Sequence, residues 1–329
     1  MAHNLFGDRF GDSRMPAWHR LGTVFQEPMS AARAYQKLGP YTVHLVDAVA
    51  DGHYLGKRAI LRDPTPDDPE VRVFGIVSED YNLITPEDIC SIFDEHVGKP
   101  IETIAALGHG EIFFVSTHLP NFGVKGDEIE DYLLLANPMT GLGSAEVRRT
   151  PVRAVCQNTL TLSENMATQR WRVVHGHDAK VRLAQWVREM YEEAETMTKI
   201  LKDLFELMAS HSVKTREAQK MFEYAYPTPG KPKHTGTAAA MNLRIQWWEE
   251  NVNLIERRRE GAKMLFEGMG TGMDVPAAKG TLWGAYNAVV ETEDYRRTTR
   301  EHSVGDSALF GERAKSKRRA FEYAVDQVK

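Results

Sequence analysis

The sequence predicts an α+β fold, with an N-terminal antiparallel β-meander with helices followed by a long-helix C-terminal part. Short alternating segments separated by turn residues occupy the chain up to about residue 177. Heptad spacing replaces that alternation from about residue 178. A chain of 329 residues with 42% apolar and 26% charged residues can bury a core, which favours two structural parts, 1–177 and 178–329.

The first elements are predicted from caps and turns. Ser30 can cap a helix over 31–38, and Gly39-Pro40 ends it. Three strands follow, separated by a turn at Asp51-Gly52 and by a polar, proline-rich loop; they are predicted over residues 41–50, 53–61 and 71–77. This order is typical of a meander.

A second helix is predicted from Thr85, because a cap residue is followed by Pro86 and by early carboxylates. A hairpin is then predicted about the turn Gly108-His109-Gly110, with strands over 103–107 and 111–119. Two further strands are expected over 129–136 and 150–156.

Apolar residues in the C-terminal part alternate spacings of four and three, which predicts two long helices. The first seam comprises Leu183, Val187, Met190, Ala194, Met197, Leu201, Leu204 and Met208, and the second comprises Met241, Ile245, Trp248, Val252 and Ile255. The two helices could pack as an antiparallel pair within one chain, or a seam could serve oligomerisation. The charged stretch 307–329 is predicted to form a peripheral helix.

Composition narrows the classes of protein to consider. No run approaches the roughly 18 apolar residues of a membrane span, and the opening residues have no apolar signal-peptide core, so we expect a cytoplasmic protein without membrane contact. Cys90 and Cys156 lie far apart in apolar segments, which fits a reducing compartment. The net charge of −5 requires any nucleic-acid binding to come from a local basic patch.

Motifs for catalysis or metal binding are incomplete. His109-Gly110-Glu111 resembles half of a zinc-deaminase motif, but the cysteine pair is missing. His175 and His177 lack further ligands and are interpreted as a solvated turn. Cys156 has no adjacent base, Pro66-Asp67 is interpreted as an acidic turn, and no phosphate loop is present. We therefore expect no catalytic residue, metal ion or cofactor.

A basic segment is the remaining candidate. Residues 148–182 contain seven basic side chains against Glu164 and Asp178. Guanidinium groups bind phosphates, Asn158 could contact a base, and Trp171 could stack on one. The candidate nucleic-acid-binding residues are Arg148, Arg149, Arg153, Asn158, Arg170, Trp171, Arg172, Lys180 and Arg182. Alternatively, the basic strand pairs with the acidic first part and Trp171 lies in the core.

Three separated motifs carry a resemblance to a known family. They are 16–23 (PAWHRLGT), 150–159 (TPVRAVCQNT) with the following His175, and 283–289 (WGAYNAV). In these motifs the chain resembles the phage/plasmid-like proteins of the domain-of-unknown-function family 932. Arg20 stands where relatives often have glycine, which places any close backbone approach at that turn in doubt.

The resemblance implies a β-meander-plus-helix pattern similar to that of the single-strand annealing proteins, such as RecT, Redβ, Erf and Rad-type annealases. The leading hypothesis is accordingly a mobile-element protein that binds single-stranded DNA and promotes annealing as a homo-oligomer, without nucleotide hydrolysis. One alternative is an interaction protein that binds a host recombination or defence protein. Another is an enzyme whose residues converge only in three dimensions.

Overall fold

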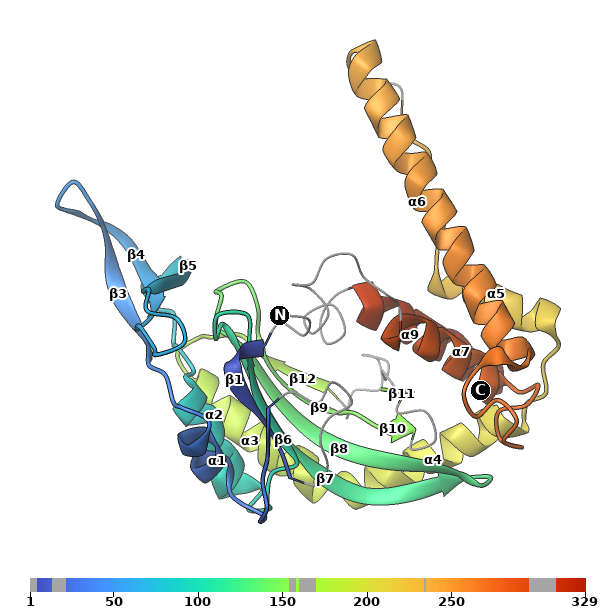
Figure 1. The fold of residues 1–329 in the computed structure, drawn as a ribbon, viewed down its shortest axis with the longest axis horizontal. Helices are drawn as coiled ribbons and strands as arrows, with labels where there is room; N and C mark the ends of the chain where they lie inside the picture. The colour runs from blue at the N-terminus through green and yellow to red at the C-terminus, as the bar shows by residue number, and fades with distance from the viewer. Residues whose placement is uncertain (1–4, 14–21, 154–157, 160–169, 234, 296–311) are drawn as a thin grey trace.

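The computed structural model describes residues 5–13, 22–153, 158–159, 170–233, 235–295 and 312–329, and it shows an α+β fold (Figure 1). The main sheet follows the order β11-β10-β8-β7-β6-β1-β2, with β9 paired to β8 and β12 paired to β9. Its strands are β1 (Leu5–Asp12), β2 (Thr23–Val24), β6 (Thr103–Leu107), β7 (Ile112–Val124), β8 (Asp127–Pro138), β9 (Ala145–Arg149), β10 (Val152–Arg153), β11 (Asn158–Thr159) and β12 (Arg170–Val173). The β1–β2 pair is parallel, and the other pairs are antiparallel.

The strand predicted over 150–156 is confirmed only at β10 (Val152–Arg153). The chain pairs with β8 twice, first through β9 and then through β10, and Thr150-Pro151 separates the two. Proline has no N–H to donate to a ladder, so regular pairing stops before Pro151 and resumes at Val152. Residues 154–156 lie outside the described residues.

The predicted meander is confirmed as a separate sheet of three antiparallel strands, β3 (Val43–Ala50), β4 (His53–Arg62) and β5 (Arg72–Ser78). The turn at Asp51-Gly52 has positive φ at both positions, +49° and +80°, which matches the twist of a tight hairpin. In Figure 1 the β3–β4 hairpin extends away from the main sheet.

Capping residues place the first two helices as predicted. Ser30 accepts a hydrogen bond from the Arg33 amide at the start of α1 (Ala31–Lys37), and Thr85 with Asp88 forms a capping box on α2 (Pro86–His96). Asp94 of α2 accepts hydrogen bonds from the amides of Ala31 and Ala32, at 2.7 and 3.0 Å. These bonds satisfy free donors of α1 and join the two helices.

The first heptad seam forms two helices rather than one, α3 (Ala179–Glu192) and α4 (Ala194–Ser210), with a break at Glu193. Both helices contact the main sheet, α3 through β9 and β12 and α4 through β7. All of the seam residues are buried except Leu204, which is partly buried. The seam therefore packs within the chain, because the sheet supplies the apolar surface that its spacing requires.

The described residues form two large apolar cores and a small third cluster, made up of Leu5, Phe10, Ala105, Leu107 and Ile112. The first core includes side chains from Phe6 to Ala194 and takes in the seam of α3. The second core joins the C-terminal half of α4 to α5 (Thr215–Ala225), α7 (Leu282–Asp294), α9 (Glu312–Val328) and the tip of the β7–β8 hairpin.

The division of the chain at residue 177 stays a prediction. The stretch predicted as a peripheral helix is wrong in part, because α9 buries Ala320, Phe321 and Ala324 in the second core.

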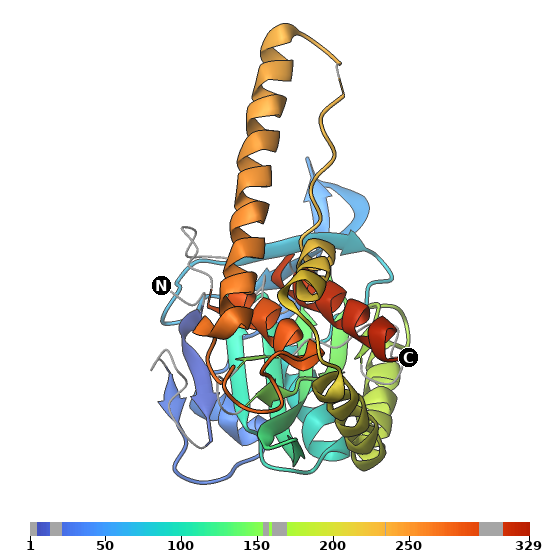
Figure 2. The ribbon, with the colours of Figure 1, turned by 90° about the vertical axis from the view of Figure 1, so that its right-hand side faces the viewer.

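The long helix α6 (Ala238–Met264) projects from the body, and a short π-helical turn, η1 (Leu265–Met269), follows it (Figures 1 and 2). The predicted antiparallel pair of long helices is wrong, since α6 packs instead against α5, α7 and η1 near its C-terminal end. The loop that precedes α6 runs beside the helix and covers the seam from Met241 to Ile255. In this contact Trp248 Nε1 donates a hydrogen bond to the Pro229 carbonyl at 2.8 Å. Within the described part of the chain, no helix combines the length and apolarity needed to cross a membrane.

Candidate nucleic-acid interface

The main sheet has two faces with different roles. Helices α3 and α4 cover one, which we call the helix-covered face. The other face, here the second face, carries a row of register partners across four strands: Ser116 of β7, Leu134 of β8, Arg148 of β9 and Arg170 of β12. Direct partners lie on the same face of a sheet, so this row places two arginines next to each other.

The adjacent row on the second face ends in an ion pair. It runs from Phe114 through Ala136 and Glu146 to Arg172. Arg172 Nε lies 2.9 Å from Glu146 Oε1; half of the arginine side chain is exposed, whereas Glu146 is buried. Arg148, Arg172 and the register position of Arg170 make up what we call the basic edge of the second face, with Glu146 as the buried counter-charge of Arg172.

Two aromatic residues that the sequence reasoning missed lie beside this basic edge. His118 and Tyr132 are register partners in β7 and β8, one row from Arg148. Their rings are 5.2 Å apart at 79°, both side chains are half-buried, and Tyr132 donates to Glu130 at 2.7 Å. The alternation of the predicted strand over 129–136 places Tyr132 on the same face as Leu134, but only the pairing of β8 with β9 brings it near the arginines.

Arg149 is not at the candidate interface. Its register partner is Leu133 of the first core, and the arginine side chain is fully buried on the helix-covered face. It forms an ion pair with the equally buried Asp131 and donates to the Ala194 carbonyl at 3.1 Å and to Thr198 Oγ1 at 2.8 Å. Burial lowers the pKa of Arg149 to about 10. The predicted phosphate contact is corrected to a structural role, since a fully buried guanidinium group is closed to a ligand.

Arg153 and Asn158 also occupy register positions of the helix-covered side. They pair with each other, and Arg153 lies opposite Ile129, whose side chain belongs to the second core. By register, positions 149 and 153 lie on the same side of the sheet, opposite to that of position 148. The side chains of Arg153, Asn158 and Arg170 lie outside the described residues.

The remaining predicted residues have structural partners. Trp171 is partly buried on the helix-covered face, with its ring centroid 5.7 Å from that of Trp186 on α3, as the alternative reading of Trp171 as core predicts. The predicted stacking of Trp171 on a base is therefore corrected, because its face is turned to α3. Lys180 contacts Asp88 at 2.7 Å and Arg182 contacts Asp178 at 3.1 Å, and both basic side chains are partly exposed.

The histidine pair before α3 is not a solvated turn as a whole. His177 is exposed, but His175 is 4% exposed and stacks on Tyr81 with ring centroids 4.8 Å apart. The Asn82 amide donates to the His175 carbonyl, and Asn82 Nδ2 donates to that of His177, which ties the turn to residues 78–85. Burial lowers the pKa of His175, so its ring is neutral at pH 7.

The residues of the incomplete zinc motif, His109 and Glu111, also have structural partners. His109 Nδ1 lies 3.3 Å from Asp68, which is itself held by Arg62 and Arg72. Glu111 accepts a hydrogen bond from the His109 amide. Among the described residues, no three histidine, cysteine or carboxylate side chains form a group that could hold a metal ion.

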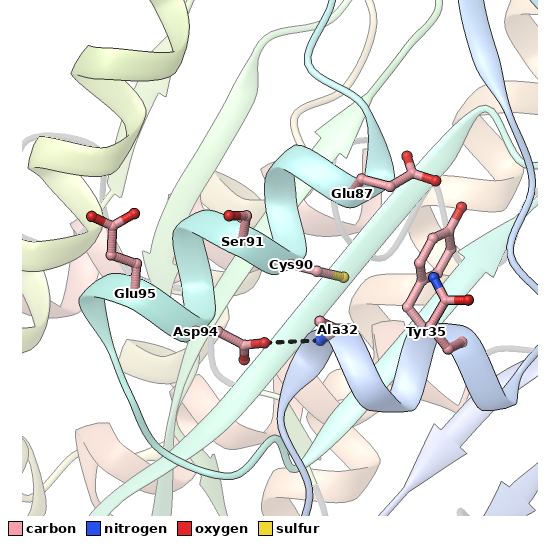
Figure 3. A pocket seen from close by; sticks show the side chains of 8 residues that line it. Ala32, Tyr35, Glu87, Cys90, Ser91, Asp94 and Glu95 are labelled. Carbon is pink, nitrogen blue, oxygen red and sulfur yellow. Dashed lines mark hydrogen bonds between the residues drawn. The ribbon is translucent and has the colours of Figure 1, made fainter.

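A pocket of about 440 Å³ lies between α1 and α2, lined by Tyr35 on one side and by Glu87, Cys90, Ser91 and Glu95 on the other (Figure 3). Burial and nearby carboxylates raise the pKa of the Cys90 thiol, which keeps it protonated. Burial also raises the pKa of Tyr35. Because the surrounding carboxylates disfavour the thiolate form, which is the nucleophilic one, the pocket gives no catalytic assignment.

A family model, "Domain of unknown function (DUF932)", matches residues 73–315, which is well over half of the chain. The chain belongs to the DUF932 family. Two of the motifs quoted for the resemblance, at 150–159 and 283–289, lie within the DUF932 match, whereas residues 16–21 of the first lie outside both the match and the described residues. No curated protein and no solved structure was found to be similar to the chain.

The DUF932 motif at 283–289 forms the buried centre of α7. Trp283 Nε1 donates to Asp127 Oδ2 at 2.9 Å, which joins α7 to the start of β8. A Cβ at Gly284 would lie 1.9 Å from the Ala278 carbonyl oxygen, so only glycine permits this close packing. This motif therefore supports the second core rather than a surface site.

Proposed function

We propose that the chain binds single-stranded DNA at the second face of the main sheet and promotes annealing as an oligomer, without nucleotide hydrolysis. The observation that carries the proposal is the basic edge, with Arg148 and Arg172 as its described side chains, beside the aromatic pair of His118 and Tyr132. Cationic and aromatic side chains on neighbouring strands are the combination that single-stranded nucleic acids require.

The register of β9 with β12 supports an anionic ligand. The backbone register places positions 148 and 170, both arginines, directly opposite each other. Guanidinium groups form charge-assisted, bidentate hydrogen bonds with phosphate groups. Annealing further requires only that two strands are held with their charges neutralised, so no acid–base group is needed.

The surrounding acidic residues limit the strength of binding. Glu130 and Glu146 lie on the same face, and Arg172 must exchange Glu146 for a phosphate. The whole chain also carries a net charge of −5. We therefore expect weak, strongly salt-dependent binding that prefers single strands, because the base faces of a duplex are already stacked.

The test is fluorescence anisotropy with labelled single- and double-stranded oligonucleotides over a series of salt concentrations. Replacing Arg148 and Arg172 together by alanine should weaken binding and reduce the salt slope by roughly one for each phosphate that the protein no longer neutralises. The matched control replaces Lys199 and Lys202 of α4 by alanine, since both are exposed and lie away from the second face. Equal losses of affinity in the two double variants would contradict the assigned face.

A second arm of the same experiment tests the aromatic pair. Tyr132→Leu should weaken binding to single strands while leaving the salt slope unchanged, because stacking releases no counterions. Absence of any oligonucleotide binding at low salt would contradict the proposed function as a whole. That result would favour an interaction protein.

A further inference from the structure

The projecting helix α6 has two apolar stripes, and the chain covers one of them. The loop after α5 runs along the first stripe: Trp248 donates to the Pro229 carbonyl, and Arg244 donates to Thr235 Oγ1 at 2.7 Å. Near the base, Arg259 donates to the Tyr226 carbonyl at 2.6 Å and to Thr228 Oγ1 at 3.0 Å. These contacts account for the seam from Met241 to Ile255.

The second stripe lies on the opposite side of α6 and is exposed. Its positions follow a strict spacing of four and three: Leu243, Trp247, Glu250, Leu254, Arg257, Gly261 and Met264. The four large apolar members, Leu243, Trp247, Leu254 and Met264, are 69%, 60%, 42% and 42% exposed. At about 100° per residue the members of this stripe are turned by roughly 100° to 180° from Trp248, about 140° on average. Figure 2 shows the loop along one side of α6 and no described segment along the side away from the loop.

We propose that a second copy of this chain covers the exposed stripe, with the two α6 helices packed antiparallel about a two-fold axis between Glu250 and Arg257. The inference does not depend on the proposed DNA binding. It commits to one occupant because the stripe is complementary to itself when reversed, and an isologous two-fold contact requires that property.

Charge selects the antiparallel direction. The stripe is acidic at Glu250 and basic at Arg257, on either side of its centre. An antiparallel pair brings each Glu250 alongside Arg257 of the second copy, whereas a parallel pair would place Glu250 against Glu250 and Arg257 against Arg257. The antiparallel arrangement also places the remaining parts of the two chains at opposite ends of the paired α6 helices.

Size complementarity points to the same arrangement. Leu254 lies near the axis and meets Leu254 of the second copy. Trp247 comes within about one turn of Gly261 of the second copy, and a Cβ at Gly261 would meet nothing within 4 Å in a single chain. Glycine is among the least favourable residues inside an exposed helix, so a neighbour that needs the space explains its presence.

The first test is the mass of the full chain by light scattering and sedimentation over a concentration series, without nucleic acid. We expect the wild type to dimerise, and Trp247→Lys with Leu254→Lys to be monomeric. The control variant Ile200→Lys with Leu207→Lys changes two exposed apolar residues of α4 at the same spacing and should keep the wild-type mass. A monomeric wild type up to about 100 μM, or equal loss in the control, would overturn the proposal.

Charge reversal tests the direction. Glu250→Arg and Arg257→Glu should each raise the dissociation constant roughly tenfold, because two ion pairs per dimer become repulsive. The combined variant should recover the wild-type value to within a few-fold. In a parallel pair neither single reversal would matter, since like charges already face each other, and failure of the combined variant to recover would contradict the antiparallel pairing.

Cross-linking gives a second, independent measurement. Leu254→Cys should form a disulfide between copies because the residue lies near the axis, whereas Leu243→Cys alone should not, because it faces the Gly261–Met264 end of the second copy. The reverse pattern would overturn the arrangement. These measurements use no DNA. A monomeric wild type would contradict the oligomer but not the proposed binding face, and a lack of oligonucleotide binding would contradict the binding face but not the dimer.

Discussion

At the scale of single residues, neighbours along the chain can have opposite roles. Arg148 and Arg149 are adjacent in β9, yet the first lies on the second face among half-buried polar groups and the second lies in a buried ion pair with Asp131. A strand turns successive side chains to opposite faces, so one residue separates a candidate ligand contact from a core contact. Burial decides which arginine can bind phosphate.

Removing the buried partner should therefore destabilise the fold. We expect Arg149→Met to lower the free energy of unfolding by about 3 kcal/mol or more, because Asp131 would remain buried as an unpaired charge. The double variant Arg149→Met with Asp131→Leu should recover most of that loss. Urea denaturation of the wild type, of Arg149→Met, of Asp131→Leu and of the double variant checks this, and a loss in the double variant that equals the sum of the two single losses would argue against a direct pair.

The buried histidine before α3 predicts a pH dependence of stability. The pKa of His175 is lowered from 6.5 in the folded chain, so on acidification the unfolded state takes up the proton first. The stability that the neutral ring contributes is present above pH 6.5 and is lost as the pH falls from there through the folded pKa.

Comparison with His175→Phe isolates this contribution, since phenylalanine keeps a ring on Tyr81 but does not titrate. The free energy of unfolding of the wild type should fall more steeply between pH 7 and pH 5 than that of the variant, measured by denaturant titration at each pH. Parallel pH profiles would show that the ring is already accessible to protons in the folded chain.

At the scale of elements, α7 anchors the far end of the long β7–β8 hairpin. Trp283 reaches Asp127, and Phe122, Val124 and Ile129 of the hairpin enter the second core beside α7. A largely buried helix is thus linked through a polar side chain to a strand more than 150 residues earlier in the chain. The hydrogen bond is charge-assisted and buried, which makes it stronger than an exposed pair.

A double-mutant cycle measures this link. We expect Trp283→Phe and Asp127→Ala each to destabilise the chain, with a coupling free energy of about 1.5–3 kcal/mol between them. Chemical denaturation of the wild type, the two single variants and the double variant supplies the four values. Additive losses would show that the indole and the carboxylate act separately.

At the scale of the whole molecule, the two cores share elements. The first core needs Leu183, Val187 and Met190 of α3, and the second core needs the tip of the β7–β8 hairpin. Neither core is therefore complete in a segment that begins or ends at residue 177. Elements that serve both cores couple their unfolding.

Two N-terminal fragments of the chain test whether the two cores depend on shared elements. The fragment 1–177 should fail to unfold cooperatively and should bind a hydrophobic dye, because the helix-covered face of its sheet is exposed. The fragment 1–193 restores α3 and should show a cooperative thermal transition in circular dichroism. A cooperative transition in 1–177 would mean that the sheet is stable without α3, and the predicted division would then stand.

Local signals were sufficient for much of the architecture. Ser30, Thr85 and Asp51-Gly52 mark helix starts and a hairpin turn by chemistry that acts within a few residues, and these elements were predicted with boundaries that differ by at most two residues. The heptad spacing of α3 and α4 likewise showed which side chains are buried. Family membership was also readable, since the motifs at 150–159 and 283–289 are contiguous in the chain.

Tertiary structure decided which face of each element is covered and by what. Spacing alone cannot distinguish a sheet, a loop or another helix as the cover, so the partner of α6 and the role of α9 were predicted wrongly. The same holds for the candidate site: the sequence shows that Arg148 and Arg149 face opposite ways, but only the packing of α3 and α4 determines which of them is buried. The approach of the His118–Tyr132 pair to Arg148 depends on which strands pair and in which register, because β9 must pair with β8 to bring Arg148 there.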